Sequence, residues 1–524
     1  MKTKMKNIDR VYSSISKGLV IISGTALLSC SSFLEETPSA ILTEANFYQS
    51  TTDAISAVDA IYASVQSGNG GWYFGDFYST TDVNTDDMFT DPSVGNATWQ
   101  AWSQLNINAE IGQIDNVWNQ HYITIGRSNA VIDLVSDDID IKDRLVGEAK
   151  FFRALAYFNL VRYFGDVPVT TSIIKNLDDA FLIAAKRSPS VEVYELIEQD
   201  LMDAAAALPD QWSGGDLGRV TSGSAYGLLA KVYLTWAGYP LQDASKYALA
   251  ADMASELVNN RSTYGYGLEE NYLDAFRTNV GKESLFEAQM KSGIGVSQGG
   301  SLAGIATFPR NLTGILGANY RGNALFRPTP DLVNSFDPQD LRYQTGMFTS
   351  LSNPDGATAS FDPHVFKYIE VEDILEQGLV LNDGGVNTKV LRFADILLIY
   401  AEALNEVNNG PTAPAFSAIN EVRSRAGLEA LSGLSYADFQ EAVYRERRWE
   451  LFGEGHRWFD LVRQNRYVST MEDFKSTFQD FPNPATTSTF EIKKNIQPYY
   501  ILMPIPQSQI NILESDGDLQ NPGY

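Results

Sequence analysis

The sequence predicts a mainly α-helical protein made of helix pairs, with an inserted irregular lobe that contains short strands. Three observations support this fold class. Residues 147–169 combine large apolar and aromatic side chains with alanine, which is typical of a buried helix. The same combination recurs at residues 224–238, 390–407 and 441–463. Between residues 263 and 389, short apolar runs separated by glycine-rich loops indicate strands instead.

The segment 147–169, GEAKFFRALAYFNLVRYFGDVPV, carries the clearest pattern in the chain. Phe151, Leu155 and Phe158 repeat at positions i, i+4 and i+7, and a second apolar stripe runs beside them. Two stripes predict burial on most of the helix circumference, and the alanines let a neighbouring helix approach closely. Gly165 is expected to end the helix. We therefore expect this helix to form the centre of the scaffold rather than a ligand site.

The other helices are expected in pairs. Two of them precede the central helix, at residues 51–67 and 115–135. The partners of the remaining helical segments are expected at residues 191–208, 244–259, 416–426 and from 438 onward. Helix pairs with alanine at their contact points resemble tetratricopeptide repeats, although their spacing departs from the regular period of about 34 residues. The pattern therefore predicts repeat-like pairs with large insertions rather than a regular solenoid.

The first 29 residues are typical of a lipoprotein signal peptide. A basic segment precedes a short apolar run at residues 19–28, which is too short to span a bilayer. Cys30 follows directly as the only cysteine, so we expect lipid attachment there; the alternative is a buried thiol. The formal net charge of −26 argues against nucleic acid as a partner.

Seven segments, taken in order, resemble the SusD/RagB family of outer-membrane nutrient-binding lipoproteins, and they span the chain from Cys30 to Tyr524. None is decisive alone, but the ordered set is specific. They are GEAKFFRALAYFNLVRYFGDVPV, AYGLLAKVYLTWAG, LRFADILLIYAEALNE, INEVRSRAGL, RERRWELFGEGHRWFDLVR, YILMPIPQSQI and QNPGY.

The resemblance implies a single domain over residues 30–524 with tetratricopeptide-like helix pairs. We expect an N-terminal part at 30–262, the inserted lobe at 263–389 and C-terminal helix pairs at 390–524. The resemblance also implies a surface-exposed outer-membrane lipoprotein, held by acylated Cys30, that binds oligosaccharide or polysaccharide. Its expected protein partner is a SusC-like TonB-dependent transporter.

The first candidate ligand site is the irregular stretch 68–108, which mixes aromatic, acidic and amide side chains. A sugar presents an apolar ring face and a rim of hydroxyls, so a site needs flat aromatics beside planar polar groups. The resemblance favours the same stretch. The residues expected to contact ligand here are Trp72, Tyr73, Asp82, Asp86, Trp99 and Trp102. The alternative for each aromatic is burial in the core.

The second candidate lies in the inserted lobe, where Tyr320 and Arg321 are expected to contact ligand. Glycine-rich flanks and several further aromatic and polar side chains surround them, and the resemblance favours an aromatic contribution from this part of the chain. These neighbours are Phe308, Arg310, Asn311, Asn323 and Phe326. The alternative is a packed loop without a ligand.

Metal, cofactor and catalytic signals are weak. Asp82, Asn84 and Asp86 begin like an EF-hand calcium loop, but the later glycine and glutamate are missing, so a solvated acidic turn is expected; the alternative is a calcium site of another type. Glu446, Glu450 and Glu454 share one expected helix face with arginines nearby, which predicts an ion-pair network. His456, on the same helix, is expected to be a packing residue. The chain has no nucleophile elbow, zinc-protease motif or phosphate-binding loop. We expect no metal, no cofactor and no catalytic residue.

Two other functions remain open on the sequence. A glycoside hydrolase needs only two suitably spaced carboxylates, and this acidic chain offers many. A scaffold that binds peptides or a non-sugar nutrient also fits repeat-like helices. Product analysis after long incubation with oligosaccharides distinguishes a hydrolase from a binding protein. A glycan panel distinguishes a glycan-binding protein from a scaffold for peptides or another nutrient.

Overall fold

The computed structural model describes most of the chain after the expected signal peptide. The described residues are 47–66, 72, 75–92, 94–291, 303–310, 312–317, 322–368, 384–477, 481–482, 489–490, 495–512 and 519–524. The signal peptide and Cys30 lie outside them. No helix within these ranges is long and apolar enough to cross a membrane.

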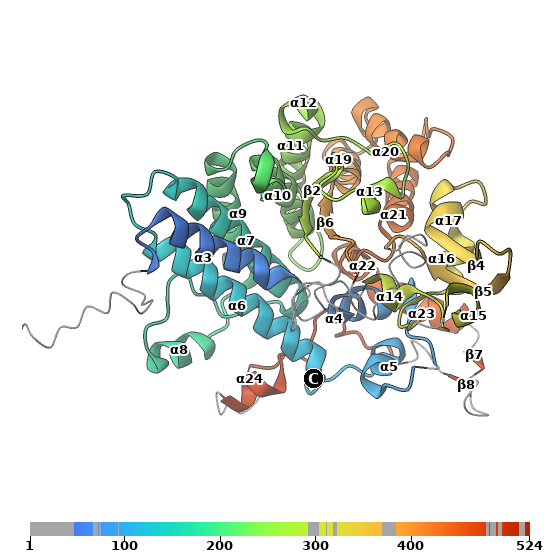
Figure 1. Cartoon of the computed structure of the whole chain (residues 1–524), viewed down its shortest axis with the longest axis horizontal. Coiled ribbons are helices and arrows are strands. Elements are labelled where there is room, and N and C mark those ends of the chain that lie inside the picture. Colours follow the sequence, from blue (N-terminus) through green and yellow to red (C-terminus); the bar gives the residue numbers. More distant parts are fainter. Residues whose placement is uncertain are drawn as a thin grey trace, which may run out of the picture.

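Helices are the main element of the described residues, and the long ones pack in sequence order, so the mainly α-helical fold class is confirmed (Figure 1). α7 packs against α6 and α9, α10 against α9 and α11, and α11 against α19. The bounds of these long helices are α3 (Thr51–Val65), α6 (Gly112–Leu134), α7 (Lys142–Phe164), α9 (Ser190–Ala207), α10 (Ser222–Ala237), α11 (Lys246–Asn259), α19 (Phe393–Asn408), α20 (Ala413–Arg425) and α21 (Tyr436–Leu451).

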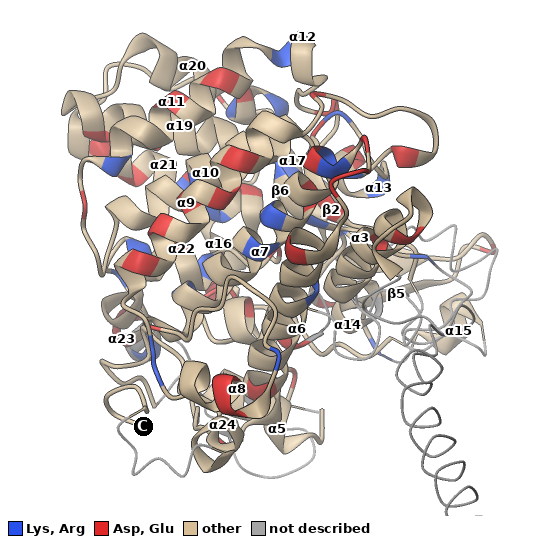
Figure 2. Cartoon of the chain, turned by 90° about the vertical axis from the view of Figure 1, so that its left-hand side faces the viewer, with Lys and Arg blue, Asp and Glu red and all other residues tan. Residues whose placement is uncertain are grey.

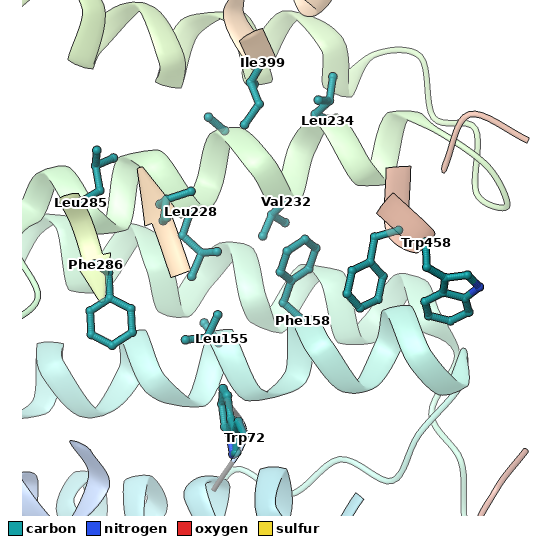
Figure 3. Close-up of a cluster of buried hydrophobic side chains, with 14 of the residues drawn as sticks. Trp72, Leu155, Phe158, Leu228, Val232, Leu234, Leu285, Phe286, Ile399 and Trp458 are labelled. Atoms are coloured by element: carbon teal, nitrogen blue, oxygen red, sulfur yellow. The ribbon is translucent and has the colours of Figure 1, made fainter. Parts of the chain in front are cut away.

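α7 is buried along nearly its whole length, as its two apolar stripes predict. Leu155 and Phe158 point from α7 toward Leu228 and Val232 of α10 (Figure 3). One continuous apolar core joins α7 to the other long helices and to the inserted lobe. The central helix is therefore the scaffold and offers little free surface to a ligand.

The predicted bounds of two helices are wrong. The segment 390–407 begins with strand β6 (Thr388–Arg392), which pairs antiparallel with β2 (Ser284–Ala288), and helix α19 starts only at Phe393. The segment 441–463 contains two helices, α21 and α22 (Arg457–Arg463). Gly453 and Gly455, at φ 67° and 81°, lie between them in a conformation that residues with a side chain rarely adopt, so the chain turns there.

The inserted lobe consists of short helices and strands. β5 pairs antiparallel with β4, and β3 pairs with β1 (Met88–Phe89) from the N-terminal part. β5 ends at Val365, and residues 366–368 belong to no strand. The bounds in the lobe are α12 (Arg261–Tyr264), α13 (Asp274–Arg277), α14 (Ala303–Thr307), α15 (Thr313–Leu316), β3 (Arg327–Pro328), α16 (Pro330–Ser335), α17 (Leu341–Gly346), β4 (Met347–Ser352) and β5 (Thr358–Val365).

The remaining short elements connect or cap these layers. They are α4 (Gly75–Tyr78), the π-helix η1 (Ser79–Val83), α5 (Ala97–Gln104), α8 (Leu177–Ala184), the 3-10 helix η2 (Gly214–Asp216), α23 (Tyr467–Thr477), β7 (Phe481–Pro482), β8 (Thr489–Phe490) and α24 (Gln507–Ile512). The pairing of β1 with β3 joins the N-terminal part to the lobe, and the pairing of β2 with β6 joins the lobe to the C-terminal helix pairs. The division at residues 262 and 389 stays a prediction.

Candidate functional site

Three acidic residues of the first candidate stretch, Asp82, Asp86 and Asp87, are buried, so the expected solvated turn is wrong. Asp82 lies in η1 and is fully buried, and Asp86 is 2% exposed. Asn84 and Asp87 are also fully buried. Hydrogen bonds and ion pairs from a distant part of the chain replace the water that such a turn would otherwise bind.

Two arginines and a glycine near the C-terminal helices hold this stretch in place. The Arg457 Nη2 and Arg448 Nη2 atoms lie 2.7 and 2.9 Å from Asp86 Oδ2. The Gly455 backbone N–H donates to Asp82 Oδ2 at 2.8 Å. Burial alone would raise the pKa of Asp86. The two guanidinium groups lower it by more than burial raises it, so the pKa lies well below the usual range. Burial and the charge of Asp87 raise the pKa of Asp82 to about 8. Asp82 and Asp86 therefore attach the stretch to α21 and α22 rather than face solvent.

Trp72 and Trp102 are core residues, which is the alternative that the sequence left open for each aromatic. Trp102 is fully buried, and Trp72 is 4% exposed. The Trp72 ring stacks on His121 of α6 at a centroid distance of 4.1 Å, below α7 (Figure 3). Burial lowers the pKa of His121 to about 3, so the imidazole packs as a neutral ring at neutral pH. Ligand contact by either tryptophan stays an untested prediction that this burial disfavours.

Trp99, like Phe77, keeps part of its side chain at the surface. It is half-buried, and its ring centroid lies 5.5 Å from that of the buried Phe326. The exposed Asn96 caps α5 by accepting hydrogen bonds from the Thr98 and Trp99 backbone N–H groups. α5 therefore fixes the indole against the lobe and leaves its outer side facing solvent.

A cluster of charged side chains is centred on Arg327, the residue after Phe326. Arg327 follows Phe326 and places Nη1 2.6 Å from Asp91 Oδ2 and Nη2 2.7 Å from Asp362 Oδ2. Asp362 is 71% exposed at its side chain, so this end of the bridge is open to solvent. We call Asn96, Trp99, Asp91, Arg327 and Asp362 the α5–β3 rim. It combines a flat aromatic with planar hydrogen-bonding groups, as sugar recognition requires.

Sequence reasoning missed the three charged members of this rim. Asp91 and Arg327 lie far apart in the chain and meet only because β1 pairs with β3. Arg327, between Phe326 and Pro328, had no local signal of a ligand site. Asp362, in β5, had no local signal of a ligand site.

The second candidate site is only partly described. Phe308 and Phe326 are buried, and Arg310 Nε donates to the Asn323 backbone oxygen at 2.8 Å. These contacts agree with a packed loop. Three of the expected ligand residues, Tyr73, Tyr320 and Arg321, lie outside the described residues, as does Asn311, and their roles stay predictions.

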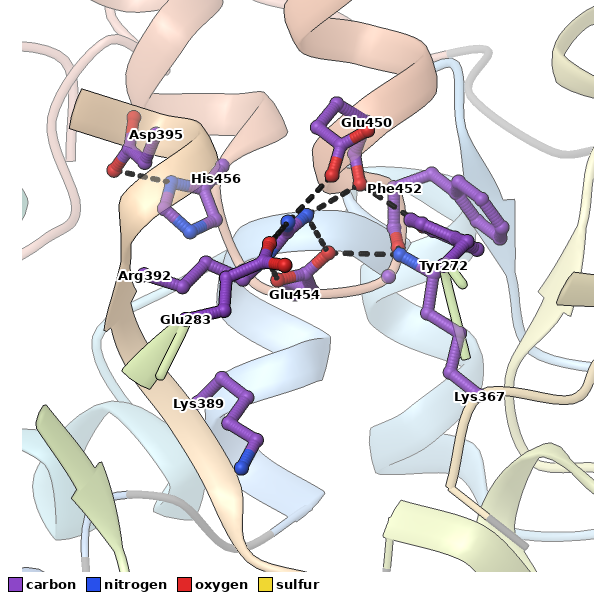
Figure 4. Close-up of polar contacts among 12 residues, drawn as sticks. Tyr272, Glu283, Lys367, Lys389, Arg392, Asp395, Glu450, Phe452, Glu454 and His456 are labelled. Atoms are coloured by element: carbon purple, nitrogen blue, oxygen red, sulfur yellow. Dashed lines mark hydrogen bonds and ion pairs between the residues drawn. The ribbon is translucent and has the colours of Figure 1, made fainter. Parts of the chain in front are cut away.

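Glu446, Glu450 and Glu454 form the predicted ion-pair network, and it is buried, although Glu454 lies in the turn after α21 and not on the same helix face. Glu450 accepts from Arg392 and Arg425, and Glu454 Oε2 lies 2.7 Å from Arg392 Nε (Figure 4). Lys367 Nζ lies 2.8 Å from Glu454 Oε1. These partners come from β6, α20 and the lobe rather than from neighbouring arginines of the same helix.

Arginine and lysine side chains hold the carboxylates of the network in their charged form. Burial raises the pKa of Glu454, but Arg392 and Lys367 lower it below its usual range, so it stays charged inside the core. The buried His456 places Nδ1 3.0 Å from Lys231 Nζ and packs in the same region. Among the described residues, no group of three or more His, Cys, Asp or Glu side chains is placed to hold a metal ion. Acidic and basic residues are interspersed over the helices in Figure 2.

Comparison with known proteins relates this architecture to one group. A model of the SusD family matches residues 344–524, and a SusD-like model described as starch-binding and associating with the outer membrane matches residues 32–234. SusD-like protein P2 of Formosa agariphila is 29% identical over 471 residues, which cover 83% of this chain and 88% of that protein. A SusD-like protein of Bacteroides ovatus is 26% identical, with 96% of each chain covered.

Solved structures give the same relationship. A SusD homolog from Bacteroides thetaiotaomicron superposes with a TM-score of 0.74 at 25% identity, covering 92% of this chain and 98% of its own. A laminarin-binding SusD-like protein superposes with a TM-score of 0.72 at 27% identity, covering 91% of this chain and 100% of its own.

Proposed function

Because this chain belongs to the SusD/RagB family, we propose that it binds oligosaccharide or polysaccharide at the cell surface and delivers it to a SusC-like TonB-dependent transporter. In this proposal the lipid on Cys30 holds it to the outer membrane. The observation that carries the proposal is the likeness, over 91% of the chain, to a SusD-like protein that binds laminarin.

We assign glycan contact to the α5–β3 rim. The half-buried Trp99 ring would cover the apolar face of a sugar, and burial of apolar area contributes roughly 25 cal/mol per Å². Asp91 and Asp362 are already bound to Arg327, so the three groups are oriented before a sugar arrives. Charge-assisted hydrogen bonds from such groups to neighbouring hydroxyls are stronger than those between neutral groups. This arrangement suits binding and positioning rather than bond cleavage.

Catalysis has less support than binding. A glycoside hydrolase needs one carboxyl group with a raised pKa beside a second carboxylate at an open cleft. Asp82 has a raised pKa but is fully buried under α21 and α22. Glu450 and Glu454 are buried and bound to arginines.

Titration calorimetry against a glycan panel tests the proposal. The panel starts with laminarin and extends to plant, host and microbial polysaccharides. We expect one glycan class to bind with a measurable dissociation constant and to remain uncleaved after long incubation. Silence across the panel would favour a non-sugar nutrient or a protein scaffold, and new reducing ends would favour a hydrolase.

The anchor has its own test. Palmitate labelling of the wild-type chain and of Cys30→Ala in cells should mark only the wild-type protein. Equal labelling of both would rule out the lipid at Cys30.

A further inference from the structure

A second binding pocket lies among the helix pairs, between the C-terminal end of α7, α9, the end of α10, α22 and the C-terminal segment. Its volume is about 350 Å³, within the usual range for small-molecule sites. None of the α5–β3 rim residues lines it. The pocket is therefore separate from the proposed glycan site.

The walls of this pocket are largely apolar. Leu241, Val462, Leu502 and Pro522 line it from four different parts of the chain. The polar groups at its edge are mostly bound to the protein already. Arg187, for example, donates to the backbone oxygens of Asp166, Phe164 and Leu519 and to Asn521 Oδ1. These bonds fix the C-terminal segment across the pocket, so its shape is preformed.

One buried hydroxyl is different. Tyr194 of α9 lines the pocket and is 5% exposed. Among the described residues, its hydroxyl has no hydrogen-bond partner, although Phe158 and Trp236 pack around its ring. A hydroxyl that lines a cavity and has no protein partner normally bonds to water or to a bound molecule. The hydroxyl is available to donate one hydrogen bond to a bound molecule.

A positive charge acts on the same hydroxyl. Arg162, which also lines the pocket, has its guanidinium 3.9 Å from the Phe158 ring centroid and 3.7 Å from that of Phe459. It donates Nε to the Phe158 backbone oxygen and Nη2 to Asn159 Oδ1. Burial raises the pKa of Tyr194, and the nearby Arg162 charge opposes that rise. The polar end of the pocket therefore combines a hydrogen-bond donor with a fixed cation.

We propose that this pocket binds a small monocarboxylate with an apolar or aromatic body. Its carboxylate would accept from the Tyr194 hydroxyl in the field of Arg162, and its body would lie against Leu241, Val462 and Leu502. A sugar fits less well, because sugar hydroxyls need many free polar partners and the pocket offers few. The proposal does not depend on glycan binding, and its test is separate from the test of glycan binding.

Calorimetry of the full mature chain with cinnamate tests this assignment, with cinnamyl alcohol as the neutral analogue. We expect cinnamate to bind with a dissociation constant below about 1 mM and the alcohol at least roughly tenfold more weakly. Absence of cinnamate binding, or equal binding of the alcohol, would overturn the proposal.

Three variants locate the site. Tyr194→Phe should weaken cinnamate binding roughly tenfold, since it removes a hydrogen bond to a charged group. Leu241→Trp should block binding by filling the pocket from a half-buried turn. Tyr226→Phe, which removes a hydroxyl from α10 outside the pocket, should change nothing. Unchanged binding in both Tyr194→Phe and Leu241→Trp would overturn the location, and circular dichroism melts confirm that each variant is folded.

Discussion

Helix α7 and the segment 72–105 are both rich in aromatic side chains, and both are largely buried, but by different means. Neighbouring helices and β2 cover α7 with apolar contacts on most of its circumference. The segment 72–105 is held by acidic side chains bonded to α21, α22 and the turn between them. Burial of α7 follows from its own periodicity, whereas burial of the segment depends on residues more than 350 positions away.

The largest effect is expected in α7. Leu155→Asp places a carboxylate at a position that is 3% exposed and should destabilise the fold by more than about 4 kcal/mol. We expect no soluble folded protein, judged by expression yield and circular dichroism. Leu155→Met keeps the volume and should cost less than about 1.5 kcal/mol. A soluble Leu155→Asp chain with a cooperative melt would contradict the account of α7 as scaffold.

The next effect concerns the attachment of the segment. Arg448→Met removes a guanidinium partner of Asp86 and Asp87 inside the core. Breaking a buried ion pair in this way should lower the free energy of unfolding by about 3–5 kcal/mol. Urea unfolding measures this loss. Arg466→Met is the matched control, because its pair with Glu441 is largely exposed and contributes at most about 1 kcal/mol. Equal losses in the two variants would mean that the segment does not depend on this attachment.

These two regions also mark how far the sequence predicts the structure. α7, α10 and α11 begin and end within a few residues of their expected bounds, because their periodicity is local. The turn at Gly453 and Gly455 was missed, because the helical pattern continues on both sides of the two glycines and so predicts a single helix. Burial of Asp82 and Asp86 was missed because Arg448, Gly455 and Arg457 meet them only in the folded chain. For the same reason, Asp91 and Arg327 were not recognised as one site.

A pH effect separates Asp82 from its neighbour Asp86. The pKa of Asp82 is raised to about 8 in the folded chain, so the folded state binds a proton that the unfolded state releases near pH 3.9. The contribution of Asp82 to stability is therefore present at low pH and is lost as pH rises through this interval. The pKa of Asp86 is lowered, so its contribution is present above pH 3.9 and is lost as pH falls toward the folded value.

Asp82→Asn tests this difference. Denaturant melts between pH 5 and pH 8 should show a flatter stability profile in the variant, by on the order of 1 kcal/mol per pH unit. The Asn side-chain oxygen can still accept from the Gly455 N–H, so the fold should be kept. Parallel profiles for wild type and variant would show that Asp82 does not titrate in this range.

The smallest stability effect is expected at the α5–β3 rim. Trp99→Ala removes a half-buried ring and should lower stability by about 1 kcal/mol. Trp102→Ala, three residues along the same helix, empties a fully buried site and should cost about 3–5 kcal/mol. Thermal melts compare them directly. Similar losses would place Trp99 in the core rather than at the surface.

The most direct test of the central claim is the affinity of Trp99→Ala for the glycan that binds the wild-type chain most tightly. Calorimetry should show binding weakened by at least about tenfold, because the ring covers the sugar face. Arg466→Met, whose ion pair with Glu441 involves no rim residue, should bind like the wild type. Unchanged affinity in a folded Trp99→Ala chain would contradict the assignment of glycan binding to the α5–β3 rim.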